Sequence, residues 1–338
     1  MKVLITGAAG FLGSHLMLHH IAKGDAVLGL DCFVSSDRDS DHARLIAQRA
    51  NNDHSMLINC DITSEREFFR YVDGSNMKFD LIYNFACPAS PPIYQSMPIF
   101  TLLTCVVGLK HVMMVAKRDG AKVVHASTSE VYGDPNVTPQ PESYRGCVNS
   151  YGPRSCYDEG KRAAEALCFD YLNMHGVDAR MVRIFNTYGP HMHPHDGRVV
   201  SNFICQALRG EQLTVYGDGK QSRSFCFVDD LIRAIVAMGA LKDNPRTPIN
   251  IGNPHEFTML ELAQKTIKLV HGDDNDDWLT YALLPTDDPM QRCPDITLAR
   301  TILNWEPKIH LDEGLERTIG YFRKCELRKD LVRCGINN

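Results

Sequence analysis

Residues 2–14 have the sequence KVLITGAAGFLGS, in which Gly7, Gly10 and Gly13 follow a short apolar run. The run predicts a buried strand, and the residues after the glycines predict a helix. Because glycine has no side chain, the backbone of such a turn can approach a pyrophosphate closely, and the N–H groups at the helix start favour its charge. The stretch therefore indicates a dinucleotide site, the alternative being a packing turn without a ligand.

Asp31 strengthens the dinucleotide interpretation, because it closes the second apolar run eighteen residues after Gly13. A carboxylate in this place accepts hydrogen bonds from ribose hydroxyls and repels a 2′-phosphate, which favours NAD over NADP. Asp61 and Ile62 end the third apolar run and are expected to touch the adenine.

Apolar runs alternate with stretches of helical period over the first two thirds of the chain. This alternation is typical of a parallel sheet wound by right-handed crossovers. We therefore predict an α/β fold with a Rossmann-type doubly wound parallel sheet. The expected strands are 2–6, 26–31, 56–62, 80–86, 122–128 and 179–186, and the expected helices follow Gly13 and span Met97–Arg118 and Tyr157–His175.

The pattern loosens after Asn186, where the turn signals YGP, YGDG and IGNP occur. We predict an NAD-binding Rossmann domain over 1–186, to which later segments return. Residues 187–325 are expected to form mainly a smaller C-terminal α/β region that binds the substrate, and residues 326–338 a tail. The polar segment Ser35–Asp53 is expected to be a surface loop and helix.

The composition is that of an ordinary globular protein of 338 residues, with 36 Lys and Arg against 41 Asp and Glu and a net charge of −5. This acidity argues against a nucleic-acid partner, because neutralising phosphates needs a basic surface. The 12 cysteines form no CxxC pair, so we expect reduced thiols in a cytoplasmic compartment. We expect no signal segment before the first strand. The longest apolar passage, around Leu231–Leu241, is too short to span a bilayer, so no membrane partner is expected.

Tyr157 and Lys161 lie four residues apart on one face of a predicted helix. A lysine ammonium near a phenol stabilises the phenolate, so this tyrosine is a candidate base at a pH below its ordinary pKa of about 10. The alternative is an ordinary surface pair. The residues Thr128, Ser129 and Glu130 end a predicted strand, and the carboxyl ends of such strands are where ligands bind.

With these residues in place, the chain resembles the extended short-chain dehydrogenase/reductase family, and within it the UDP-glucuronate decarboxylases, also called UDP-xylose synthases. The resemblance runs from Met1 to about Phe322. The glycine turn and YDEGK at 157–161 match the superfamily at large. Five motifs are more specific, and their combination is specific to the decarboxylases: CPASPP at 87–92, ASTSEVYGDP at 126–135, RIFNTYGP at 183–190, DGRVVSNF at 196–203 and DDPMQRCPDI at 287–296.

The resemblance implies that a retained NAD⁺ takes a hydride from C4 of UDP-glucuronate and later returns it, giving UDP-xylose and CO₂. Oxidation at C4 makes the carboxylate at C6 β to a ketone, so CO₂ leaves without a metal or pyridoxal. Tyr157 acts as the base, Thr128 holds the C4 oxygen, and Arg292 binds the carboxylate or steers the water that protonates C5. The implied catalytic residues are Thr128, Ser129, Glu130, Tyr157, Lys161 and Arg292, and the implied cofactor contacts are Gly7, Gly10, Phe11, Leu12, Gly13, Asp31, Asp61, Ile62, Ala86, Tyr157 and Lys161.

Ser129 distinguishes a decarboxylase from the sugar-nucleotide 4,6-dehydratases, which carry an aspartate at this position to protonate the leaving hydroxyl. Serine cannot supply that proton. Two alternatives remain open: a decarboxylase that releases a UDP-4-keto-pentose with NADH, or an apiose-type product, and a non-catalytic NAD- or nucleotide-sugar-binding module.

The resemblance also implies the substrate contacts. Arginine suits the UDP phosphates because its planar fork matches phosphate oxygens. We expect no metal site at His191, His193 and His195, because Pro194 interrupts the geometry and no fourth ligand is evident. The implied substrate-binding residues are Pro88, Ser90, Tyr94, Asn186, Arg198, Val199, Tyr216, Gln221, Arg223 and Arg292.

Four positions depart from the family pattern and remove polar groups around the site. Cys32 and Cys105 replace usual asparagines, and Phe100 and Cys293 replace usual lysines. These replacements bear on cofactor affinity and turnover more than on the reaction type. The family also pairs the helices near Met97–Arg118 and Tyr157–His175 into a four-helix interface, so a homodimer is expected.

Overall fold

The computed structural model describes residues 1–36, 46, 55–273, 275–284 and 291–333. Its centre is a seven-stranded sheet in the order β11-β6-β5-β4-β1-β2-β3, in which every neighbouring pair is parallel. Strand order reverses on either side of β1, which creates a ligand-binding crevice at the carboxyl edge. The strands are β1 (Lys2–Thr6), β2 (Ala26–Asp31), β3 (Met56–Asn59), β4 (Leu81–Asn84), β5 (Lys122–Thr128), β6 (Ala179–Ile184) and β11 (Ile249–Ile251).

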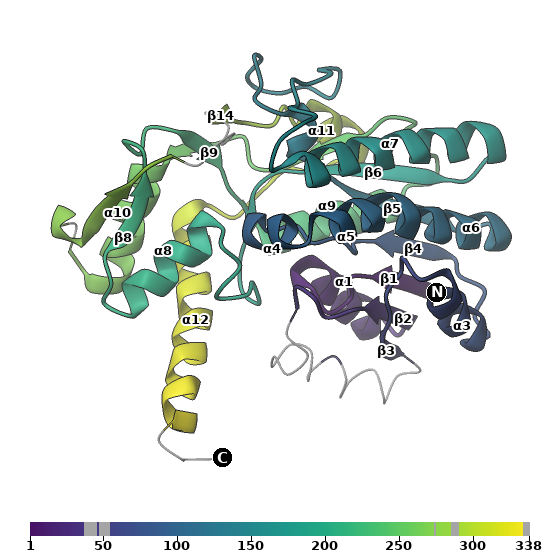
Figure 1. Ribbon diagram of the computed structural model, residues 1–338, viewed down its shortest axis with the longest axis horizontal. Helices are drawn as coiled ribbons and strands as arrows, with labels where there is room; N and C mark the ends of the chain where they lie inside the picture. Colours follow the sequence, from purple (N-terminus) through teal and green to yellow (C-terminus); the bar gives the residue numbers. More distant parts are fainter. Residues whose placement is uncertain (37–45, 47–54, 274, 285–290, 334–338) are drawn as a thin grey trace.

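Helices cover both faces of the sheet because the strands are apolar on both sides (Figure 1). Val3 and Ile5 of β1 belong to the core with one helix set, and Leu4 between them belongs to the core on the other face. The first set is α1 (Phe11–Ala22), α9 (Val228–Ala240) and α11 (Thr297–Leu303). The second set is α3 (Glu65–Gly74), α5 (Pro98–Leu103), η1 (Thr104–Gly108), α6 (Leu109–Asp119) and α7 (Ser155–His175).

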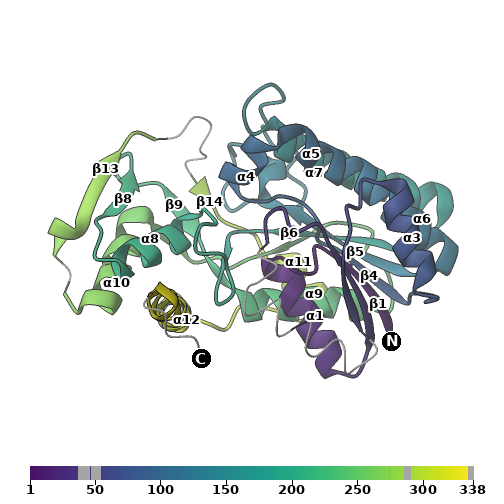
Figure 2. The same ribbon diagram turned by 60° about the horizontal axis from the view of Figure 1, so that its bottom comes forward.

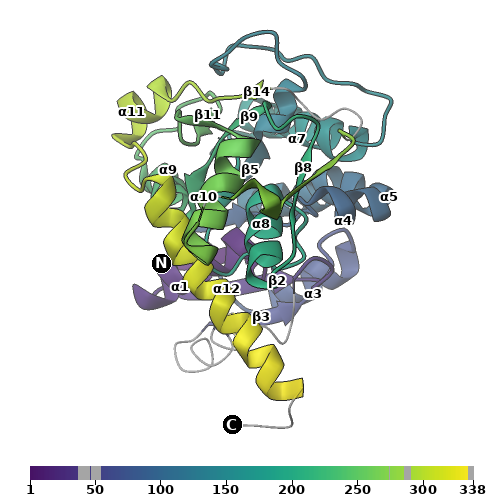
Figure 3. The same ribbon diagram turned by 90° about the vertical axis from the view of Figure 1, so that its left-hand side faces the viewer.

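A smaller region is built from three short sheets and three helices, which group to one side of the main sheet in Figure 2. The long helix α12 packs against α8 and α10 and runs past both of them in Figure 3. The elements are β7 (Thr187–Tyr188) with β10 (Cys226–Phe227), β8 (Leu213–Tyr216) with β13 (Leu279–Ala282), β9 (Ser222–Ser224) between β12 (Glu256–Thr258) and β14 (Gln291–Arg292), and the helices α8 (Val199–Leu208), α10 (Met259–His271) and α12 (Leu311–Arg333). Three short helices complete the described chain: α4 (Pro91–Ser96), η2 (Ser129–Tyr132) and η3 (Asp276–Trp278).

The predicted fold class is confirmed, and each of the six expected strands overlaps one in the structure. The seventh strand, β11, was not expected. The predicted helix after Gly13 begins two residues earlier, at Phe11. The predicted segment Ser35–Asp53 lies mostly outside the described residues. The predicted tail begins inside α12, which continues to Arg333.

The helix predicted over Met97–Arg118 is more apolar than the sequence analysis recognised. The helical run Pro98–Asp119 has 22 residues, and its most apolar 18-residue window has a mean hydropathy of 1.9, so by length and composition alone it is sufficient for a membrane span. Leu231–Leu241 is therefore not the longest apolar passage. In the structure this run packs against α7 and against β4 and β5, and 56% of its most apolar window is buried. Core helices of globular proteins have the same character.

Candidate active site

A cavity of about 1010 Å³ opens where the loops at the carboxyl edge of the sheet meet the smaller region. The wall on the sheet side comes from the loops after β1, β2, β4 and β5, and the opposite wall from α8, β8, β9 and β14. Every site residue predicted from the sequence lines this cavity. They are Gly7, Gly10, Phe11, Leu12, Gly13, Asp31, Asp61, Ile62, Ala86, Pro88, Ser90, Tyr94, Thr128, Ser129, Glu130, Tyr157, Lys161, Asn186, Arg198, Val199, Tyr216, Gln221, Arg223 and Arg292.

The glycine turn is packed too tightly for side chains. Gly7 has a φ of +71°, and a Cβ placed on it would lie 2.7 Å from the carbonyl carbon of Phe85. A Cβ on Gly13 would lie 1.9 Å from the carbonyl oxygen of Gly7. Helix α1 begins immediately after Gly10, so its first N–H groups face the cavity wall. This cradle fits the pyrophosphate of a dinucleotide.

Asp31 ends β2 and lies beside this turn. Its carboxylate accepts hydrogen bonds from the backbone N–H of Ala9 at 2.9 Å, from the N–H of Phe33 at 2.7 Å and from the hydroxyl of Ser36 at 3.0 Å. Burial raises the pKa of Asp31, and these donors oppose that shift. The carboxylate is thus fixed at the cavity wall, where a ribose hydroxyl is its natural partner.

Tyr157 and Lys161 face the cavity from α7, and both are buried. The Lys161 ammonium donates to the carbonyl of Ala126 at 2.8 Å and lies 5.7 Å from the centre of the Tyr157 ring. The ring of Tyr94 stacks on that of Tyr157 at 5.1 Å. Burial raises the pKa of Tyr157 well above its ordinary value, and a hydrogen bond with Thr128 opposes the shift only in part. In the protein groups alone, burial therefore acts against the predicted lowering of the phenol pKa, which stays a prediction for the cofactor-bound enzyme.

Glu130 forms the charged centre of the site. Both oxygens of its carboxylate accept from Arg292, at 3.1 Å from Nη1 and 2.9 Å from Nη2. Nη1 of Arg292 also donates to the hydroxyl of Ser129 at 3.0 Å, and Nη2 donates to the carbonyl of Gly133 at 2.9 Å. Burial opposes ionisation of Glu130, but the charges and hydrogen bonds of Arg292 and Arg154 outweigh it and lower its pKa to about 2.

Arg154 belongs to the same cluster and was missed in the sequence. Its Nη2 donates to Glu130 at 2.5 Å, and its Nε lies 3.8 Å from a carboxylate oxygen of Asp158. Burial, followed by the negative charge of Glu130, raises the pKa of Asp158 to about 7. The available signal was spacing, since Arg154 precedes Tyr157 by three residues and Asp158 by four, which places all three near one helix face.

The wall formed by the smaller region carries the predicted nucleotide-sugar contacts. Arg223 on β9 is buried, with Nη1 donating to the carbonyl of Ser222 at 2.9 Å. Arg198 precedes α8 and lies 2.9 Å from a carboxylate oxygen of Asp196, so its charge is partly balanced. The side chain of Gln221 donates to the carbonyl of Tyr216 at 2.8 Å, while the Tyr216 ring is 42% exposed. These placements leave one aromatic face and two guanidinium groups near the cavity.

The four departures from the family pattern divide into two pairs. Cys32 and Phe100 line the cavity. Cys105 and Cys293 are buried behind its wall, where the Sγ of Cys105 contacts Cys87 and the Sγ of Cys293 donates to the carbonyl of Pro254. The cavity also has the histidines His191, His193 and His195 on its wall. Across the described ranges, no group of three or more His, Cys, Asp or Glu side chains is arranged to hold a metal ion.

Comparison with known proteins agrees with this geometry. Residues 3–252 match the model of the NAD dependent epimerase/dehydratase family. The chain belongs to this family. Its glycine turn, Asp31 and the Tyr157–Lys161 pair therefore lie in the part of the sequence that the family model covers.

Within the family, the chain is similar to named decarboxylases. It is 46% identical over 323 residues to UDP-glucuronic acid decarboxylase 1 of Xenopus tropicalis, a match that covers 96% of this chain and 72% of the relative. It is also 46% identical over 317 residues to UDP-glucuronic acid decarboxylase 3 of Arabidopsis thaliana, covering 93% and 87% respectively.

The fold is similar to that of a solved epimerase. The crystal structure of UDP-glucuronic acid 4-epimerase from Bacillus cereus, in complex with UDP-glucuronic acid and NAD, matches with a TM-score of 0.79 and 27% identity. The match covers 96% of this chain and all of the epimerase chain. The architecture of this family thus serves more than one reaction on related sugars, and the site residues must decide between them.

Proposed function

We propose that this protein decarboxylates UDP-glucuronate in an NAD-dependent reaction that yields UDP-xylose and CO₂. The observation that carries the proposal is the buried cluster of Glu130, Arg292 and Ser129 beside Tyr157. Curated relatives 46% identical over most of the chain are named UDP-glucuronic acid decarboxylases. The serine at position 129 supplies no acid for expelling a hydroxyl, which argues against a 4,6-dehydratase.

The residues of the glycine turn and Asp31 fit NAD. Cβ atoms at Gly7 and Gly13 would collide with the surrounding backbone, so only glycine allows the close turn that brings the start of α1 to the cavity. Asp31 presents a fixed carboxylate rather than a cation that would suit a 2′-phosphate. When bound, NAD⁺ supplies a hydride acceptor for C4 of the sugar and a positive charge near the phenol.

Tyr157 accepts the proton of the C4 hydroxyl during oxidation. Its phenol is buried and keeps its proton in the protein alone, so it gives up that proton only when a positive charge lies close to it. Thr128, which is hydrogen-bonded to the phenol, aligns the sugar oxygen with Tyr157. The same phenol returns the proton when the ketone is reduced.

Arg292 acts through Glu130 and Ser129. Both terminal nitrogens of its guanidinium are engaged by Glu130, Ser129 and Gly133, and only Nε lacks a hydrogen-bond partner among the described groups. The two terminal nitrogens of the guanidinium are thus already hydrogen-bonded to protein groups. Of the two roles expected from the sequence, steering the water that protonates C5 suits this arrangement better than two-pronged binding of the sugar carboxylate.

The product of the reaction decides between the alternatives. Purified protein is incubated with UDP-glucuronate and the nucleotide sugars are weighed by mass spectrometry. Loss of one CO₂ without accumulation of NADH supports the proposal. Loss of a further two hydrogens with stoichiometric NADH indicates a released UDP-4-keto-pentose. An unchanged mass with a new retention time indicates epimerisation. Bound NAD without turnover indicates a binding module.

The Tyr157→Phe variant tests the mechanism. It removes one hydroxyl from the buried ring and is expected to lower turnover by about a hundredfold or more. The Tyr281→Phe variant is the matched control, because that ring lies on β13 and is 58% exposed. Equal turnover in the two variants would contradict the assigned role of Tyr157.

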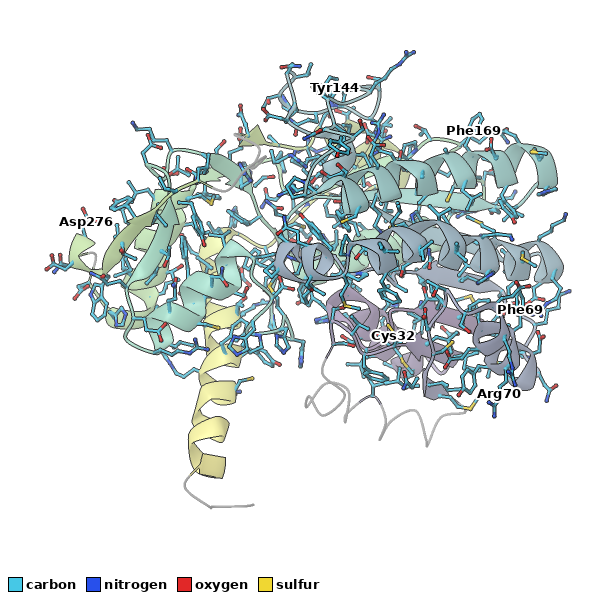
Figure 4. All side chains as sticks on the ribbon, viewed as in Figure 1. Cys32, Phe69, Arg70, Tyr144, Phe169 and Asp276 are labelled. Atoms are coloured by element: carbon cyan, nitrogen blue, oxygen red, sulfur yellow. The ribbon has the colours of Figure 1, made fainter. Side chains whose placement is uncertain are left out.

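We also propose that the protein is a homodimer formed through α5 and α7. Ile99 of α5 is 74% exposed and Phe169 of α7, labelled in Figure 4, is 60% exposed. Between these helices, Ile99 and Leu102 line a surface hollow of about 300 Å³ together with Cys156. Exposed apolar side chains on adjacent helices favour a helical interface with a second copy.

A reducing compartment such as the cytoplasm is the proposed location. No disulfide joins any two of the cysteines in the described part of the chain. Thiols in this number persist where glutathione and thioredoxin keep them reduced.

A further inference from the structure

Two cysteines meet directly behind the reacting groups. The sulfur of Cys87, in the loop after β4, lies 3.4 Å from the sulfur of Cys105, in the π-helical turn η1. Cys87 is half-buried and lines the cavity, whereas Cys105 is 2% exposed and lies behind the wall. One residue of the pair therefore borders the space that a small solute can enter.

The local structure holds Cys105 against this partner. A π-helical turn inserts an extra residue into a helix and is often associated with functional sites. On the other side, Cys105 packs against Gly160 of α7, where an added Cβ would lie 3.2 Å from both the Cβ and the Sγ of Cys105. Gly160 is followed directly by Lys161. The cysteine is thus wedged between the loop and the helix that carries Tyr157 and Lys161.

The pair also has the electrostatics of a reactive dithiol. Hydrogen bonding from Cys87 lowers the pKa of Cys105 to about 7, against the effect of burial and with help from the charge of Lys161. Burial raises the pKa of Cys87, and its hydrogen bond to Cys105 adds to the rise. The two sulfurs therefore share one proton near neutral pH, and a thiolate is the nucleophile in thiol oxidation.

We propose that hydrogen peroxide converts Cys87 and Cys105 into a reversible disulfide that switches off the reaction at Tyr157 and Lys161. The switching half of this inference rests on the proposed function, whereas disulfide formation does not. An S–S bond is about 2.05 Å long, so the sulfurs need to approach by roughly 1.4 Å. That distance is within reach of a loop and a helical turn already in contact.

The chemistry is balanced. The sulfur of Cys87 attacks the O–O bond while its proton passes to Cys105, so an S–O bond forms and hydroxide leaves. The hydroxide takes the proton of Cys105, whose sulfur then attacks the sulfenic sulfur of Cys87, forming the S–S bond and breaking the S–O bond. The two sulfurs lose two electrons, and both oxygens of the peroxide end as water or hydroxide.

The disulfide disturbs the site by moving one of its loops. It draws the loop that includes Ala86, Pro88 and Ser90 toward α7, and these three residues line the cavity. Ser90 is hydrogen-bonded to the carbonyl of Asp196, so the movement extends to the opposite wall. A shift of about 1 Å in such a site costs on the order of a hundredfold in rate.

The test uses the full-length protein as purified. Wild type is treated with hydrogen peroxide, excess oxidant is removed, and turnover of UDP-glucuronate is measured before and after addition of dithiothreitol. In parallel, non-reduced peptides are mapped by mass spectrometry for a Cys87–Cys105 link that is lighter than the two thiols by two hydrogens. We expect the link, a fall in turnover of about a hundredfold, and recovery with dithiothreitol.

Two variants provide the controls. Cys105→Ser removes the second sulfur at nearly constant size and is expected to lose the link and resist reversible inactivation. Cys147→Ser removes an exposed thiol away from the pair and is expected to behave like wild type. Absence of the link, full activity of the linked protein, or reversible inactivation of Cys105→Ser would overturn the inference. Inactivity of untreated wild type would instead count against the proposed function, and peptide mapping would still test disulfide formation.

Discussion

The carboxylate of Glu130 and the guanidinium of Arg292 form a two-pronged pair inside the protein, with both N–O distances between 2.9 and 3.1 Å. Arg292 is 2% exposed, and it comes from β14, 162 residues from Glu130 in sequence. Such a fork fixes the orientation of a carboxylate, which a point charge does not do. The pair therefore links the smaller region to the end of β5.

The first prediction concerns this fork. Arg292→Lys keeps the charge but loses the paired geometry and the bond to Ser129 or to Gly133. The loss of this fork displaces Glu130 and Ser129 beside the reacting groups, and a misplacement of about 1 Å in an active site costs on the order of a hundredfold in rate, so we expect a loss in kcat/KM of that size. The control is Arg300→Lys on α11, whose side chain is 55% exposed and 3.5 Å from Glu306. Similar activity in the two variants, with folding checked by circular dichroism, would contradict the role given to Arg292.

Much of the site was predictable from the sequence because the signals are local or follow chain order. The glycine turn needs a strand before it and a helix after it, and Asp31, Thr128 and Asn186 each come at or just after the carboxyl end of a strand. In a parallel sheet these ends share one edge, so the side chains meet in one cavity. No knowledge of long-range packing was needed for that step.

The remaining features depend on tertiary packing. Strand β11 has only three residues, which is too short for a periodic signal in the sequence, and Gly252 and Pro254 follow it. The spacing of Tyr157 and Lys161 predicted a shared face, but not the burial that raises the phenol pKa. Likewise the contact between Cys87 and Cys105 requires the fold of the loop against the π-helical turn.

The second prediction concerns pH. Burial raises the pKa of Asp158 from its ordinary value of 3.8 to about 7. A raised carboxyl pKa stabilises the fold fully below the unfolded value, and this contribution is lost as the pH rises from 3.8 through 7. Glu130 has the opposite sign, because its contribution is lost only as the pH falls from 4.5 through about 2. Of these two carboxyl groups, only that of Asp158 therefore changes its contribution to the free energy of unfolding between pH 5 and 8.

The Asp158→Asn variant tests this assignment, because asparagine has nearly the same shape and does not titrate. We expect the difference in Tm between pH 5 and pH 8 to be smaller in this variant than in wild type. The control is Asp73→Asn, since the Asp73 side chain is 58% exposed and pairs with Arg118 at the surface. An unchanged pH dependence of Tm in Asp158→Asn would show that another group is responsible.

The third prediction concerns assembly. Ile99→Glu places a charge on the apolar surface of α5, and a buried charge without a partner opposes association. We expect light scattering at micromolar concentration to give a dimer for wild type and a monomer for the variant. Leu283→Glu is the matched control, because Leu283 is 93% exposed and follows β13 in the smaller region. A monomeric wild type, or a dimeric Ile99→Glu variant, would exclude the α5–α7 interface.

The fourth prediction concerns cofactor retention. Gly13→Ala adds a methyl group whose carbon would lie 1.9 Å from the carbonyl oxygen of Gly7, and a contact this short with backbone forces the chain to shift. Helix α1 has to move away from the turn, which carries its N–H groups away from the pyrophosphate position. Gly320→Ala on α12 is the control, because no atom lies within 4 Å of its added Cβ and alanine favours the helix by up to about 1 kcal/mol. We expect the amount of nicotinamide cofactor released on denaturation to fall sharply in Gly13→Ala and to match wild type in Gly320→Ala. Full cofactor content in Gly13→Ala would refute the assignment of the glycine turn to cofactor binding.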